Sequence, residues 1–152
     1  MGLGDTAAAV GKGLLAGAVG TVAMTVSSTV EAKLRERGSS SAPADAAGKV
    51  LGVQPRDEAG EARFATVVHW AYGTSWGAVR GLLQAIGLDG GRATVAHFAA
   101  VWGSAQVMLP ALEVAPPMWE SPPEEIAIDA FHHAVYVIAT GLAFAALEAS
   151  SS

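Results

Sequence analysis

Long apolar stretches separated by short polar segments are the main pattern along this chain of 152 residues. The first stretch, for example, has no charged residue between Lys12 and Glu31. About 20 predominantly apolar residues are enough for a helix to cross the hydrocarbon core of a bilayer. The pattern therefore predicts an all-α fold, a four-helix transmembrane bundle with antiparallel neighbours, with helices at about residues 7–34, 62–88, 92–112 and 123–147.

The polar loop at residues 35–61 is the longest connection in this prediction. Within it, Ser41 to Val53 can hold a short helix, with Pro43 in its first turn and Gly52 at its end. This helix is too short to span a bilayer, so we expect it to lie at the interface. The chain has the length of one domain, and we interpret residues 1–152 as a single multi-pass membrane domain.

The composition supports this interpretation and excludes several classes of protein. Hydrophobic residues make up 51% of the chain and charged residues 15%, whereas a soluble domain carries roughly 25% charged residues. The mean hydropathy is +0.38. A net charge of −5 gives no sign of nucleic-acid binding, and the absence of cysteine excludes disulfides and thiolate metal sites. The expected partner is therefore the lipid bilayer.

Small residues recur at four-residue spacing in the first two predicted helices. Such rows let helix backbones approach closely in lipid, so we expect the two faces to pack together. An oligomer, or a complex with a partner membrane protein, could form through the same faces. The first row is Gly13, Gly17 and Thr21, and the second is His69, Gly73, Gly77 and Gly81.

Basic residues are concentrated in and beside the first loop, which holds six of the nine Lys and Arg residues. By the positive-inside rule this loop is cytoplasmic, and both termini face the other side. The six residues are Lys33, Arg35, Arg37, Lys49, Arg56 and Arg63.

Ionisable residues form a ridge at the start of the fourth predicted helix, where Glu125, Asp129 and His133 recur every fourth residue. Four crossings would bring this ridge to the same membrane face as Glu31 and His69. We therefore expect a polar pocket that binds a ligand or protons, formed by Glu31, His69, Glu125, Asp129, His132 and His133.

Two kinds of chemistry suit such a pocket. Carboxylate and imidazole groups bind divalent metals such as Zn, Fe or Mn, and the expected metal ligands are His69, Asp129 and His133. The same groups relay protons inside membranes. Simpler explanations exist as well: Glu125 can complement a helix dipole, Glu31 can be solvated, and buried histidines can be internally hydrogen-bonded.

Two segments resemble the YagU-like small bacterial inner-membrane proteins, a family of unknown function. They are HWAYGTSWGAVRGLL and LPALEVAPPMWESPPEEIAIDAFHHAVY. The shared features are His69 in an aromatic-flanked helix, Leu112 followed by a proline pair, and the ridge at Glu125, Asp129 and His133, where Asp129 replaces a Glu. The resemblance implies a multi-pass helical fold in a bacterial inner membrane, and it assigns no catalytic residues.

Three hypotheses follow from the sequence. The first is a small membrane protein whose acid/His pocket binds a cation or relays protons. The second is a non-catalytic packing or accessory subunit that assembles through the glycine faces. The third is a soluble four-helix domain. An enzyme is not favoured, because the chain has no phosphate-binding loop, HExxH motif or nucleophile elbow.

Overall fold

The computed structural model describes residues 2–38 and 40–151, and these residues form an all-helical fold with no strand. The prediction of an all-α fold is confirmed. The elements are α1 (Leu3–Leu34), α2 (Ala42–Leu51), α3 (Glu58–Ala85), α4 (Gly90–Ala111), the short 3-10 turn η1 (Met118–Glu120) and α5 (Pro123–Ala149).

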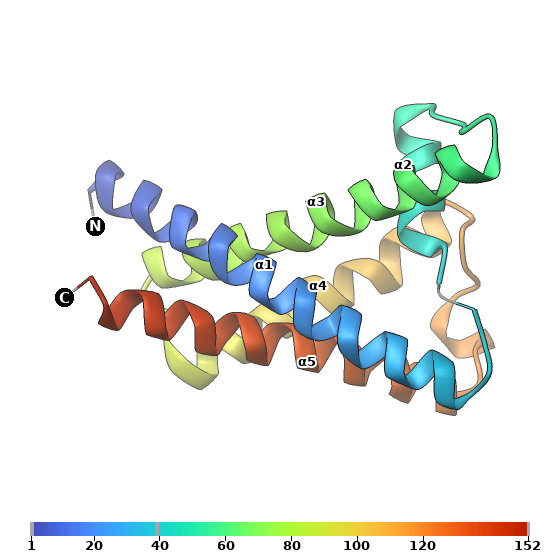
Figure 1. Cartoon of the computed structure of the whole chain (residues 1–152). Helices are drawn as coiled ribbons and strands as arrows, with labels where there is room; N and C mark the ends of the chain where they lie inside the picture. Colours follow the sequence, from blue (N-terminus) through green and yellow to red (C-terminus); the bar gives the residue numbers. More distant parts are fainter. Residues whose placement is uncertain (1, 39, 152) are drawn as a thin grey trace.

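The four long helices form an antiparallel bundle in which α1 packs against both α3 and α5, and α4 lies behind them (Figure 1). Lys12 pairs with Glu148 near one end of the α1–α5 contact, and Arg35 pairs with Glu125 at the other. The N- and C-termini lie at the same end of the bundle, and α2 lies at the opposite end (Figure 1).

Local capping explains where the helices differ from the predicted ranges. Helix α3 begins earlier than predicted because the Asp57 carboxylate accepts a hydrogen bond from the Gly60 amide at 2.7 Å. It ends at Ala85 because Gly87 adopts a positive φ of 85°, which terminates a helix. The short helix in the first loop is present as α2, with Gly52 in the left-handed conformation at its end.

The two rows of small residues face each other inside one chain. A Cβ atom added at Gly17 would lie 2.7 Å from the Thr74 carbonyl oxygen and 2.8 Å from the Gly77 Cα atom. Added Cβ atoms at Gly13 and Gly81 would also meet backbone, and Gly73 lies against Thr21. Helices α1 and α3 therefore cover these faces for each other, and assembly with another chain stays a prediction.

Helix α1 is apolar on its outer side as well as its inner side. Its buried residues are small, whereas its large apolar side chains point away from the bundle. A soluble bundle buries its large apolar residues, whereas helices in lipid pack through small ones. The outward side chains form a stripe at three- and four-residue spacing: Leu15, Val19, Val22, Val26 and Val30.

Two of the four long helices, α1 and α5, are long and apolar enough to cross a membrane. Only 28% of the apolar window is buried in each of them. Helices α3 and α4 do not reach that criterion. Helix α3 carries Glu58, Glu61 and Arg63 in its first turns and Arg80 further along. The structure therefore shows a helical bundle with two candidate spans, which is less than the four spans that the sequence predicts.

Candidate functional site

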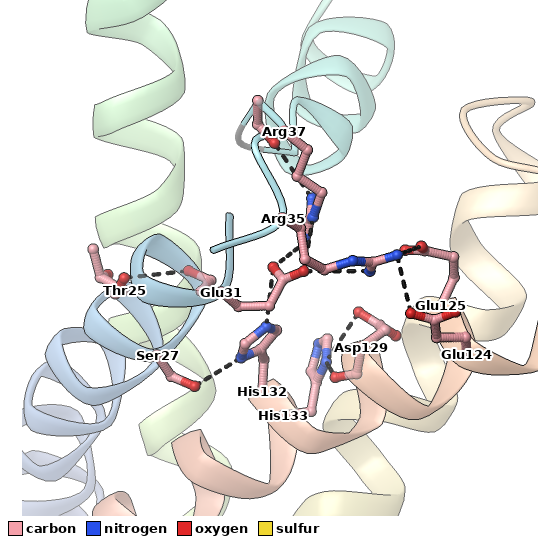
Figure 2. Close-up of polar contacts among 12 residues, drawn as sticks. Thr25, Ser27, Glu31, Arg35, Arg37, Glu124, Glu125, Asp129, His132 and His133 are labelled. Atoms are coloured by element: carbon pink, nitrogen blue, oxygen red, sulfur yellow. Dashed lines mark hydrogen bonds and ion pairs between the residues drawn. The ribbon is translucent and has the colours of Figure 1, made fainter. Parts of the chain in front are cut away.

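The charged cluster of the molecule lies where α1 leaves the bundle and α5 enters it (Figure 2). Glu31, in the last turn of α1, accepts hydrogen bonds from Arg35 Nη1 at 3.3 Å and from Arg37 Nε at 2.9 Å. Arg37 Nη2 also contacts this carboxylate. The Glu31 side chain is 16% exposed, so it lies at the boundary between the bundle and the solvent.

Arg35 connects this end of α1 to the first turn of α5. Its Nη2 atom lies 2.7 Å from Glu125 Oε1 and 3.3 Å from Glu124 Oε1. The hydrogen bond with Glu125 and the neighbouring carboxylates raise the pKa of Arg35 above its usual range. Glu125 therefore complements the start of α5 and also binds the end of α1.

His132 lies directly beneath Glu31 and is 5% exposed. Its Nδ1 atom is 2.8 Å from the Ser27 hydroxyl, and its Nε2 atom is 3.6 Å from Glu31 Oε2. The imidazole therefore stands between a hydroxyl inside the bundle and a carboxylate at its rim (Figure 2). The separation of 3.6 Å is longer than a hydrogen bond, so Nε2 faces the carboxylate without bonding to it, and a protonated ring would form an ion pair with Glu31.

Asp129 and His133 form a separate pair that faces α4. Asp129 Oδ2 accepts hydrogen bonds from Trp102 Nε1 at 2.8 Å and from Gln106 Nε2 at 3.3 Å. His133 Nδ1 is 2.8 Å from the Asp129 carbonyl oxygen and 3.4 Å from its Oδ1 atom. A carbonyl oxygen can only accept, so His133 Nδ1 carries the hydrogen.

His69 lies on the other flank of α1, where its Nε2 atom is 2.8 Å from the Thr25 hydroxyl. Thr25 donates its own hydrogen to the Thr21 carbonyl oxygen at 2.7 Å, so it accepts from the His69 Nε2–H group. His69 therefore continues the α1–α3 packing face, as the four-residue spacing predicts, and it is hydrogen-bonded to α1 rather than to a carboxylate.

The residues predicted to form a single pocket instead form three separate sets of contacts. His69 binds Thr25, His132 lies between Ser27 and Glu31, and Asp129 with His133 faces α4. No group of three or more His, Asp or Glu side chains in the described part of the chain could hold a metal ion. The structure does not bring together the expected metal ligands His69, Asp129 and His133, because His69 faces α1 whereas Asp129 and His133 face α4.

Several members of the site were not predicted from the sequence as site residues. Ser27 precedes Glu31 by one helical turn, so the spacing could have placed it on the same face of the helix. Arg35 was assigned only to the basic first loop, and Trp102 and Gln106 had no assigned role. The sequence gives no signal for these contacts, because they depend on how α1 and α4 are rotated against α5.

No protein-family model, no curated protein and no solved structure matches this chain. The resemblance to the YagU-like proteins therefore stays an expectation, and the function must be argued from the arrangement of the residues themselves.

Proposed function

We propose that this chain is a small multi-pass membrane protein whose acid/His site takes up and releases protons at one face of the bilayer. The observation that carries the proposal is the series Ser27, His132 and Glu31, in which a buried imidazole is hydrogen-bonded to a hydroxyl inside the bundle and faces, at 3.6 Å, a carboxylate at its rim. Ionisable groups inside membrane bundles commonly serve proton or ion paths.

The membrane environment is supported by the outward-facing apolar stripe of α1 and by the exposed apolar side chains of α5, which include Phe131, Ile138 and Leu142. Burying such surface in lipid removes it from water, whereas leaving it in water is unfavourable. The resemblance suggests a bacterial inner membrane, and the basic first loop suggests that the Glu31 end faces the cytoplasm.

Proton exchange fits the geometry of the site better than cation binding does. Glu31 is neutralised by Arg35 and Arg37, and Glu125 is neutralised by Arg35, so neither carboxylate is available as a strong cation ligand. His132 Nε2 faces Glu31 Oε2 at 3.6 Å, while the Ser27 hydroxyl is hydrogen-bonded to the other ring nitrogen. The site can therefore change its protonation without assembling new ligands.

The first test measures proton uptake by the purified protein in lipid nanodiscs after a jump from about pH 8 to about pH 5.5, the interval in which imidazoles titrate. We expect His132→Gln to reduce the number of protons taken up. Glu31→Gln should also reduce it, because the imidazolium loses its neighbouring carboxylate.

The matched control is Glu120→Gln, the same substitution at an exposed residue of η1. It should leave the uptake unchanged. Equal proton uptake in the unmodified protein, His132→Gln and Glu31→Gln would contradict the proposed site.

A further inference from the structure

One face of α5 is buried along most of the length of the bundle. His132, Tyr136, Thr140 and Phe144 recur every fourth residue, and none is more than 5% exposed. Residues at this spacing line one side of a helix. Helix α5 begins at the site described above and runs toward the end of the bundle that holds both termini (Figure 1).

Two polar side chains from other helices pack against this face. The His97 ring of α4 lies 5.7 Å from the Tyr136 ring, and its Nε2 atom is 3.0 Å from the Trp76 carbonyl oxygen. The Arg80 guanidinium of α3 lies 4.2 Å above the Phe144 ring. Thr140 lies one helical turn from Tyr136 and one from Phe144, so along α5 it lies between the levels of His97 and Arg80. We name this set the core column; it consists of His132, Tyr136, Thr140 and Phe144 of α5, His97 of α4 and Arg80 of α3.

The buried side-chain polar atoms that lack a hydrogen-bond partner in the described residues all belong to this column. They are His132 Nε2, Thr140 Oγ1, His97 Nδ1 and Arg80 Nε. Buried polar atoms in proteins are usually hydrogen-bonded, and internal water is the usual partner where protein groups do not serve. Their gathering along one face is therefore not accounted for by packing alone.

The unpartnered atoms also complement one another as donors and acceptors. Because His97 Nε2 faces a carbonyl oxygen, it carries the hydrogen, and Nδ1 of the neutral ring is an acceptor. Arg80 Nε is a donor, and the Thr140 hydroxyl can do both. Water molecules can join such groups into a chain, because each water donates and accepts.

Charged pairs lie near both ends of the column. At one end Glu31 meets Arg37 and the rim of the bundle, and toward the other end Lys12 pairs with Glu148 at 2.6 Å. From His132 to Glu148 the helix rises by about 24 Å, at about 1.5 Å per residue. This length approaches the hydrocarbon thickness of a bilayer, which is about 30 Å.

We propose that the core column is a water-threaded proton pathway that connects the acid/His site with the opposite face of the membrane. The inference rests on the proposed function and extends it from proton exchange at one face to proton transfer across the bundle. In each step one O–H or N–H bond breaks as another forms, so no electron carrier is needed. The fixed charge of Arg80 opposes cations near the far end, so it limits the flux.

The test uses the full-length protein in vesicles of phosphatidylcholine and phosphatidylglycerol that contain a pH-sensitive dye. A potassium gradient with valinomycin supplies the driving potential. We expect proton entry above that of protein-free vesicles, a fall of at least about tenfold in Thr140→Val, and a rise in Arg80→Gln. Thr66→Val, the same change at an exposed residue of α3, should behave like the unmodified protein.

Tyr136→Phe gives a second variant within the column, because it removes the hydroxyl that donates to the Gly73 carbonyl oxygen at 2.6 Å while keeping the ring. It should also lower the flux. If neither Thr140→Val nor Tyr136→Phe folds, solid-state NMR of the unmodified protein in bilayers decides whether water protons exchange with the His97 ring. A dry His97 ring would overturn the pathway.

Absent flux in the unmodified protein, or equal flux in Thr140→Val and Thr66→Val, would also overturn the pathway. These failures are distinguishable from failure of the proposed function. If His132→Gln reduces proton uptake in nanodiscs but the unmodified protein gives no flux in vesicles, only the pathway is contradicted. If neither the reduced uptake nor the flux is observed, both proposals are contradicted.

Discussion

The adjacent histidines His132 and His133 have different environments, because their side chains point toward different neighbouring helices. His132 is buried against α1 between Ser27 and Glu31, whereas His133 pairs with Asp129 on the side of α4. Successive residues of a helix point about 100° apart, so the two rings cannot share one ligand set easily. His132 therefore lies in the α1–α5 interface, and His133 lies on the side of α5 that faces α4.

The contact between Asp129 and Trp102 can be measured by a double-mutant cycle with Asp129→Ala and Trp102→Phe. We expect a coupling free energy of about 0.5–1 kcal/mol, the range found for interhelical hydrogen bonds in membrane proteins, because the carboxylate is partly exposed. Thermal unfolding of the single and double variants in detergent gives the value. Strictly additive effects would show that the hydrogen bond at 2.8 Å does not stabilise the α4–α5 contact.

At the scale of the helices, close contact between α1 and α3 is the main packing device. Gly17 and Gly77 touch backbone to backbone, and the row continues through Gly73 with Thr21 to His69 with Thr25. Contact of this kind gains dispersion energy without large side chains. The sequence spacing predicted the partners on these two helices because both rows keep the same four-residue period.

The glycine contact predicts opposite effects for the same substitution at two sites. Gly77→Ala should destabilise the bundle by about 1–3 kcal/mol, because the added Cβ atom would lie 2.7 Å from the Gly17 Cα atom. Gly103→Ala should stabilise it by up to about 1 kcal/mol, because no atom lies within 4 Å of its added Cβ and alanine favours the helix. Thermal unfolding in detergent measures both, and equal effects would contradict the contact.

At the scale of the whole molecule, much of the outer surface is apolar. Large apolar side chains such as Val26 and Leu142 are exposed, whereas the buried face of α1 consists of glycine, alanine and threonine. Helices α1 and α5 meet the length and hydropathy of membrane spans. Such a surface is compatible with lipid and unfavourable in water.

We therefore expect the expressed protein to remain in the membrane pellet after an alkaline carbonate wash and to leave it only with detergent. An integral membrane protein and a peripheral one from the same cells serve as controls for the wash. Recovery of folded, monomeric protein in detergent-free buffer would contradict a membrane location and favour the soluble four-helix domain.

The polar site was only partly predictable. Glu31, Glu125 and His132 do gather at the loop end of the bundle, because antiparallel helices bring the end of the first and the start of the last together. His69 is at the same end of α3 but is turned toward Thr25. Periodicity tells which residues share a face of a helix, but not which neighbour that face meets.

The sequence by itself determined the helices, their order and the close packing of α1 with α3, since spacing and hydropathy act locally along each segment. Only the tertiary structure decided that Asp129 faces Trp102, that Arg35 joins Glu125, and that His97, Thr140 and Arg80 gather beside one face of α5. The reason is physical: the rotation of each helix about its axis follows from simultaneous contacts with two neighbours, and no single segment contains that information.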